Sequence, residues 1–271
     1  MRIYFSPSFP KTQDYSIIAM IHYLGYSVTR TSEEPFDFGY MWNDSTYVTP
    51  SEELRKIAKE KVVLNINCTD ISKVYVDHIF KEISGYGSLI DPFTYQGKCI
   101  KKYDENGKGG GEIIACPIKN HSSSEGSIYQ KFIETNPSGP QLEYRVPIVM
   151  GVPPIVFEVY KDNPETVEGK LIKNQMKHSI TIKNTDTIFS KKEQEQIIQF
   201  CRNIGFDIGE LDILRCAETK KMYIIDANTT PTYFNMLNRY WNPLEKRKAI
   251  AIVAEEWEKQ LKTLLPNLQT T

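Results

Sequence analysis

Hydrophobic residues recur along the chain in two patterns, short apolar runs typical of strands and the spacing of an amphipathic helix. The first part of the chain contains both patterns. Residues 2–5 form a short apolar run, and the apolar residues of 14–26 recur at helical spacing until Gly25. Residues 61–67 form another short apolar run of the kind that is typical of a buried strand. A strand, a helix and a further strand in this order predict a small N-terminal α/β lobe over residues 1–90.

Capping signals mark two more helices in this lobe. The segment Thr49-Pro50-Ser51-Glu52 matches a capping box with proline at the first helical position, so we expect a helix that continues to residue 60. Thr69 or Asp70 is the expected N-cap of the next helix, which stops at Gly85 because glycine readily ends a helix.

From about residue 86 the pattern changes and short strands dominate. The strand-like segments are residues 97–103, 111–118, 127–133, 142–150, 154–161, 208–216 and 220–228. One helix is expected between Ser190, with Glu193 completing a capping box, and Gly205, and a last helix begins at Pro243. These elements predict an α+β region over residues 91–271.

Composition and charge exclude several classes of protein. The 271 residues are 40% hydrophobic and 25% charged, as in a soluble globular protein, and the formal net charge is -1. Without a basic excess, nucleic acid is not the expected partner. No apolar run is long enough to span a membrane, and proline and charge come too early for a signal peptide. We therefore expect a cytoplasmic protein.

Cysteine usage agrees with that compartment. The five cysteines are scattered and include no C-x-x-C pair, so neither a disulfide framework nor a structural zinc site is expected. Several lie inside apolar strand-like runs, where we expect them to be small buried side chains.

Acidic residues on two neighbouring strands are the clearest candidate for chemistry. Glu210 and Asp212 share one face of their strand, and Asp226 and Asn228 share one face of the next. If the two strands form a hairpin with Asp212 opposite Asp226, three carboxylates and an amide converge. Such a group repels itself unless a cation is bound, and oxygen ligands suit Mg²⁺. The alternative is an ordinary solvated hairpin face.

Two further features suit a phosphate. The loop of residues 104–111 is rich in glycine and follows Lys101 and Lys102, one of which points to each face of its strand. The alternative for the loop is a flexible hairpin tip. Arg145 lies within an apolar strand and needs a partner, which is either Glu143, another acidic residue or a phosphate.

Taken in order, these parts resemble the ATP-grasp superfamily over about residues 62–236, most specifically in the closing Asp212 and Asp226-Ala227-Asn228 motif. The resemblance implies a mostly antiparallel pair of ATP-binding lobes after the small N-terminal lobe. It implies that Arg145 and Lys102 act in catalysis and that Mg²⁺ is held by Asp212, Asp226 and Asn228. The ATP-binding residues that it implies are Lys73, Lys101 or Lys102, Gly109, Gly110, Gln130, Phe132, Ile133 and Arg145.

The resemblance also implies a reaction. We expect ATP with two Mg²⁺ ions, or Mn²⁺ in their place, to activate a small-molecule carboxylate as an acyl phosphate for attack by an amine or thiol. Such chemistry needs positioning and electrostatics rather than a protein nucleophile. The alternatives are a small-molecule kinase, since Asp226 stands where the ligases usually have Glu, and a nucleotide-binding protein without catalysis. A homodimer is compatible with all three.

The acceptor is expected beside the metal ligands. Thr229 and Thr230 directly follow Asn228, so their hydroxyl groups are candidates to contact the acceptor or the phosphates. For the next aromatic residues, Tyr233 and Phe234, the alternative is packing under the last helix.

Overall fold

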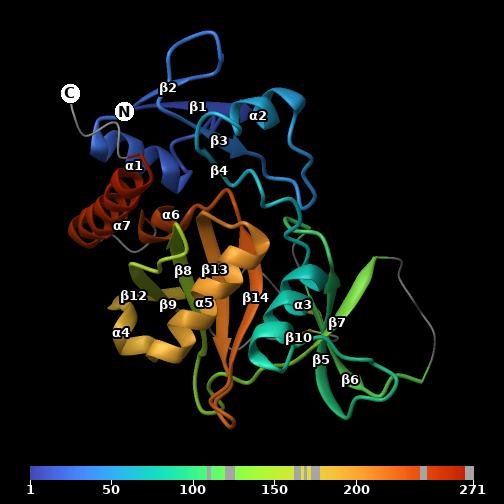
Figure 1. The fold of residues 1–271 in the computed structure, drawn as a ribbon. Helices are drawn as coiled ribbons and strands as arrows, with labels where there is room; N and C mark the ends of the chain where they lie inside the picture. Colours follow the sequence, from blue (N-terminus) through green and yellow to red (C-terminus); the bar gives the residue numbers. More distant parts are fainter. Residues whose placement is uncertain are drawn as a thin grey trace.

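The computed structural model describes residues 1–108, 111–119, 126–161, 166–167, 170–171, 178–238 and 243–265. The described part of the chain contains three sheets, one of four strands and two of five strands. Figure 1 shows the N-terminal sheet above the other two, with helices packed on their faces. The fold is α+β, as the sequence predicts.

The N-terminal sheet is parallel, with the strand order β2-β1-β3-β4. Its elements are β1 (Arg2–Pro7), α1 (Ser16–Leu24), β2 (Ser27–Thr29), β3 (Phe38–Trp42), α2 (Glu52–Ile57) and β4 (Val63–Leu64). Helix α1 ends at Gly25 in the left-handed conformation. The N-cap of α2 is Ser51, whose hydroxyl accepts a hydrogen bond from Leu54 N, so the capping box predicted at Thr49 is wrong by two residues.

The second sheet has the order β10-β11-β6-β5-β7 and is antiparallel. Its strands are β5 (Gly97–Tyr103), β6 (Glu112–Cys116), β7 (Ser127–Lys131), β10 (Thr166–Val167) and β11 (Lys170–Leu171). Strand β5 is central to the ladder and pairs with both β6 and β7, which fixes the faces of Lys101 and Lys102.

The third sheet has the order β12-β9-β8-β13-β14 and is also antiparallel. Its strands are β8 (Gln141–Val149), β9 (Ile155–Lys161), β12 (His178–Asn184), β13 (Ile208–Arg215) and β14 (Met222–Asn228). The helices that follow or precede these strands are α4 (Thr185–Ile188), α5 (Lys191–Ile204), α6 (Tyr233–Asn238) and α7 (Pro243–Leu264). The predicted capping box of Ser190 and Glu193 is present.

Helix α3 (Lys73–Ser84) packs against β14 and α5, although it precedes the second sheet in sequence. Its N-cap is Ser72 rather than Thr69 or Asp70, and its apolar residues Val76, Ile79 and Phe80 join a core shared with the third sheet. This packing brings the N-terminus of α3 to the β13–β14 hairpin.

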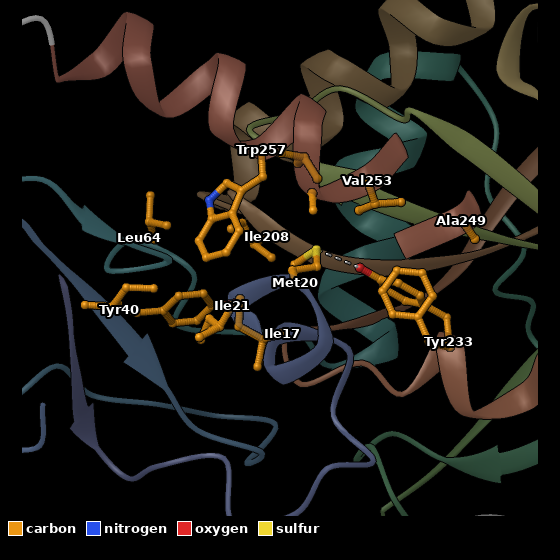
Figure 2. Packing of buried hydrophobic residues seen from close by; sticks show 14 of the residues in the cluster. Ile17, Met20, Ile21, Tyr40, Leu64, Ile208, Tyr233, Ala249, Val253 and Trp257 are labelled. Carbon is orange, nitrogen blue, oxygen red and sulfur yellow. Dashed lines mark hydrogen bonds between the residues drawn. The ribbon is translucent and has the colours of Figure 1, made fainter. Parts of the chain in front are cut away.

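The last helix returns to the start of the chain. Figure 1 shows α7 beside α1. In Figure 2, Trp257 of α7 points into a core that also holds Tyr40 of β3 and Ile21 of α1. Tyr233 and Phe234 are buried in this core, at 0% and 2% exposure, so they pack under the last helix rather than in a site.

Two findings match expectations from composition. In the described part of the chain, no helix is both long and apolar enough to traverse a bilayer. The five cysteines are free thiols, and all but Cys216 are buried.

Glu193 is expected to stabilise the joint between α5 and β13. Its carboxylate accepts hydrogen bonds from Ser190 N and the Ser190 hydroxyl, both at 2.9 Å, and from Arg215. Burial acts to raise the pKa of Glu193, but Arg215 and Ser190 outweigh it and lower it. Glu193→Gln should therefore cost about 1–2 kcal/mol of unfolding free energy at pH 7, measured by urea unfolding.

The pH dependence follows from that direction. A lowered pKa gives stability that is complete above the ordinary pKa of glutamate, about 4.3, and is lost as the pH falls toward the folded-state value. The difference between wild type and Glu193→Gln should therefore narrow below about pH 4. Glu195→Gln, on the exposed side of the same helix, is the matched control and should differ little from wild type. If both substitutions lowered the unfolding free energy equally, the stabilising role assigned to Glu193 would be wrong.

Candidate functional site

The hairpin of β13 and β14 has the register on which the carboxylate cluster depends. Asp212 lies directly opposite Asp226, and Glu210 lies opposite Asn228. On the other side of β13, Arg145 of β8 lies opposite Asp212. A register shift follows Asp212, so the ladder is irregular just beyond these residues. Arg145, Asp212 and Asp226 therefore form a row across three adjacent strands.

Arg145 contacts carboxylates in this structure. Its Nε lies 3.0 Å from Glu143 Oε1 and 3.8 Å from Asp212 Oδ1, and its Nη1 lies 3.4 Å from Glu210 Oε1. Lys161 Nζ, at the end of β9, donates to Glu143 Oε2 at 2.5 Å. Glu143 is thus the bridge between two cations, and Lys161 is a residue of the site that the sequence does not mark.

The pKa values of the carboxylates are shifted in opposite directions. Burial raises the pKa of Glu210 to about 8 and that of Asp212 to about 7, against the opposing effect of Arg145. Burial acts on Glu143 in the same sense, but Lys161 and Arg145 prevail and lower its pKa to about 2. Glu143 is therefore the carboxylate with enough positive charge around it, whereas Glu210 and Asp212 lack it.

Two lysines reach the cluster from other elements. Lys73 Nζ, at the start of α3, lies 3.7 Å from Asp226 Oδ1. Burial lowers the pKa of Lys102, and among its charged neighbours Asp226 and Asp212 oppose this effect while Lys73 adds to it. Lys101 is on the other face of β5 because side chains alternate along a strand. The geometry therefore favours Lys102 over Lys101 as the second lysine.

The start of the glycine-rich loop folds over Lys73. The Lys73 ammonium donates to Asn106 Oδ1 at 2.8 Å, Glu105 O at 3.2 Å and Asp104 O at 3.4 Å. The Asn106 amide in turn donates to Ala227 O at 2.8 Å, and Asn106 N donates to the Thr46 hydroxyl at 2.8 Å. Gly109 and Gly110 lie outside the described residues.

Asn106→Ala is expected to loosen the contact between the start of the glycine-rich loop and Lys73. An ammonium has three donors, and here all three face oxygens of the loop, so a phosphate must displace at least one of them. Without the Asn106 side chain the loop loses one of its three bonds to Lys73 and its bond to Ala227 O, so amide hydrogen exchange over residues 103–108 should become faster in nucleotide-free protein. Asn136→Ala, in the loop between β7 and β8, is the control. Unchanged exchange over residues 103–108 would show that the Asn106 side chain does not hold the loop.

The predicted adenine segment lies at the end of β7. The Gln130 side chain is 3% exposed, and its Nε2 donates to the Ser88 hydroxyl. Phe132 N already donates to Lys98 O at 2.9 Å, and the Ile133 side chain packs in the core beneath the third sheet. Among these three residues, Gln130 has the polar side chain that remains available to a ligand.

Both threonines are buried and bonded within the protein. The Thr229 hydroxyl donates to Asn43 O at 3.1 Å, which ties the exit of β14 to the end of β3. Asn228 Oδ1 accepts from Thr230 N at 2.9 Å and from the Thr230 hydroxyl at 3.3 Å. In this structure Thr230 orients Asn228, and a cation on Asn228 Oδ1 would share that oxygen with Thr230.

The donor set fits Mg²⁺ that is bound together with phosphates. Glu210 Oε2 is buried without a hydrogen-bond partner in the described structure, which marks a shortage of positive charge or donors there. No three acidic, histidine or cysteine side chains of the described residues form a group able to hold a metal ion by themselves. Mg²⁺ commonly takes only one or two carboxylates, because phosphate and water oxygens complete its shell. Asp212 and Asp226 can supply these two.

Comparisons with known proteins find similarity in structure alone. No protein-family model and no curated protein matches the sequence. Among solved structures, the ATP-grasp ligase PsnB complexed with a minimal precursor is 13% identical with a TM-score of 0.55, covering 88% of this chain and 93% of that one. D-cycloserine synthetase DcsG is 11% identical with a TM-score of 0.55, over 94% and 99%. D-alanine–D-alanine ligase from Bacillus anthracis is 10% identical with a TM-score of 0.52, over 96% and 99%.

Proposed function

Because the chain has the ATP-grasp fold, we propose that it is an ATP- and Mg²⁺-dependent ligase that activates a carboxylate for attack by an amine or thiol. One observation carries this proposal. Lys73, Lys102 and Arg145 come from three separate elements and meet at the paired carboxylates Asp212 and Asp226. Cations beside carboxylates on a sheet are what the binding of a metal-bound polyphosphate requires.

The balance of charges in the site is compatible with the binding of ATP together with Mg²⁺. Four cations, Lys73, Lys102, Arg145 and Lys161, lie among four carboxylates. ATP brings about four negative charges and two Mg²⁺ ions bring four positive ones, so the pair adds almost no net charge. With both bound, Lys73, Lys102 and Arg145 would face phosphate oxygens, while Asp212 and Asp226 would face Mg²⁺.

The residues then have separate tasks. Asp212, Asp226 and Asn228 would hold Mg²⁺, which supplies charge neutralisation across the phosphates when it is bound. Lys73 and Lys102 hold the phosphates from the α3 and β5 sides. Arg145, kept in place by Glu143, faces the transferring phosphoryl group and stabilises its charge.

We propose that the acceptor binds at the carboxyl ends of the parallel strands β1 and β3. The chain leaves these two neighbouring strands in opposite directions, and ligands of α/β sheets commonly bind at such a point. The bond from Thr229 to Asn43 O connects this edge to the metal ligands. The structural neighbours complexed with precursor peptides suggest that a peptide carboxylate should be tested alongside small molecules.

An assay of the purified protein tests the proposal. The protein is incubated with ATP, Mg²⁺ and panels of carboxylates and peptides with amines or thiols, and phosphate release and product mass are followed. Free phosphate together with an amide or thioester supports the ligase. A stable phosphorylated product would support the kinase instead. Tight ATP binding without turnover on any panel would support a nucleotide-binding protein without catalysis.

A further inference from the structure

A chain of hydrogen bonds runs from α3 to β7 through the segment between them. The Ser88 hydroxyl donates to Asp77 Oδ1 at 2.6 Å, and Gln130 Nε2 donates to the Ser88 oxygen at 3.0 Å. Ser88 N donates to the same Asp77 oxygen. All three side chains are buried, with exposures of 3%, 1% and 3% for Asp77, Ser88 and Gln130. The proposed function gives no task to Asp77 or Ser88.

The direction of these bonds is fixed at the Asp77 end. A carboxylate only accepts hydrogen bonds, so the single proton of the Ser88 hydroxyl goes to Asp77. The Ser88 oxygen can then only accept, and Gln130 must present its NH₂ group to it. The Gln130 carbonyl oxygen, Oε1, consequently faces the other way, and no hydrogen bond to it occurs within the described structure. The result is an oriented acceptor on a buried side chain.

The position of this acceptor follows from the elements that carry it. Ile100 of β5 pairs with Gln130, and Lys102 pairs with Ile128, so Lys102 and Gln130 lie on the same face of the second sheet. Asp77 lies one helical turn after Lys73, on the same face of α3. The hydrogen-bonded chain of Asp77, Ser88 and Gln130, called the relay below, therefore joins the face of α3 that carries Lys73 to the sheet face that carries Lys102.

Gly87 lies so close to the Asp77 carboxylate that this position has room for glycine alone. A Cβ atom at Gly87 would lie 2.5 Å from Asp77 Oδ2, so any larger residue there would push the Asp77 carboxylate away. Glycine at this position leaves the space in which Asp77 reaches Ser88.

We propose that Asp77 and Ser88 are positioning residues that orient the Gln130 amide as an acceptor for the exocyclic amino group of the nucleobase, and so select adenine over bases with a carbonyl group at that position. The proposal rests on the proposed function, since it concerns the same nucleotide site. A 6-amino group donates to Oε1. A 6-carbonyl group places two acceptors against each other, and the fixed amide cannot turn to relieve this.

The test compares ADP with IDP, which differ at the 6-position of the base. Their dissociation constants are measured with Mg²⁺ by calorimetry on the full chain. Wild type should prefer ADP by about tenfold, as expected for one well-placed hydrogen bond against an unpaired acceptor. Ser88→Ala removes the relay and lets the Gln130 amide turn, so the preference should fall to about threefold or less. Ser84→Ala, at the end of the same helix, is the matched control and should keep the wild-type preference.

Asp77→Ala is the second variant and covers the case in which Ser88→Ala does not fold. Without the carboxylate, the Ser88 hydroxyl loses the acceptor for its proton, so it can donate to the Gln130 amide oxygen and let the amide turn. The ADP preference should again fall, whereas mere loosening of the structure would weaken ADP and IDP equally. An unchanged ratio in both variants overturns the relay, as does equal binding of ADP and IDP to wild type, and both outcomes leave the ligase proposal standing. Binding of neither nucleotide to wild type overturns both proposals.

Discussion

Asp226→Asn is expected to lower turnover by about 100-fold or more, because it removes a negative charge from the centre of the proposed Mg²⁺ site. Asp226 lies opposite Asp212 and 3.7 Å from Lys73, so it belongs to the proposed metal site and to the phosphate site. The measurement is the steady-state rate of ATP-dependent product formation at ordinary Mg²⁺. Partial recovery at higher Mg²⁺ or with Mn²⁺ is expected, since mass action refills a weakened site.

A measurement of thermal stability distinguishes a loss of turnover from a loss of folding. Burial raises the pKa of Asp226, against the opposing effect of Lys73 and Lys102, so the ionised carboxylate is costly in the absence of metal. The thermal midpoint of Asp226→Asn should therefore equal or exceed that of wild type. Asp186→Asn, at an exposed position on α4, is the control for the same chemical change. Near wild-type turnover of Asp226→Asn at ordinary Mg²⁺ would show that the metal assignment is wrong.

Arg145→Met should cost about 3–5 kcal/mol of unfolding free energy, which is the usual cost of removing one partner from a buried ionic group. Arg145 is the cation that faces Glu143, Glu210 and Asp212 together. Glu143 keeps Lys161, but Glu210 has no other ion pair in the described structure and is 3% exposed. Because the pKa of Glu210 is raised to about 8, the effect is measured by urea unfolding at pH 9, where Glu210 is ionised beside Arg145.

A second substitution identifies the cause. If an unpaired Glu210 accounts for most of the loss, Arg145→Met combined with Glu210→Gln should recover a large part of it, by an interaction energy of about 1–3 kcal/mol. Arg202→Met, on the exposed side of α5, is the matched control and should stay within about 0.5 kcal/mol of wild type. A loss for Arg145→Met below about 1 kcal/mol would mean that water or protonation already relieves these carboxylates.

The strands and helices were largely predictable because the signals are local. The alternation of residues 208–216 and 220–228 predicted a hairpin, and its register is the one observed. Helix C-caps at Gly25, Gly85 and Gly205 were predictable because glycine adopts the left-handed conformation without strain. Two N-caps were misplaced by two or three residues, because several neighbouring Ser, Thr and Asp residues can each cap a helix, and packing selects one.

Part of the site was not predictable. Lys161, Asp77 and Ser88 have no distinguishing motif, and Asn106 is marked only as part of the glycine-rich loop. Each gains its contacts from residues that are remote in sequence or belong to another element. The partner of Arg145 also remained open until the register of three strands was known.

The sequence by itself determined most of the order of elements, without β2, β3 and β12, together with the acidic hairpin and the two adjacent lysines before a glycine-rich loop. These features depend on spacing within a few residues. Only the tertiary structure decided that Lys102 rather than Lys101 faces the carboxylates, that Glu143 bridges Arg145 and Lys161, and that Thr230 orients Asn228. These outcomes depend on how three sheets pack and on the strand register. A shift of one residue reverses every face, and no local pattern fixes that choice for strands far apart in sequence.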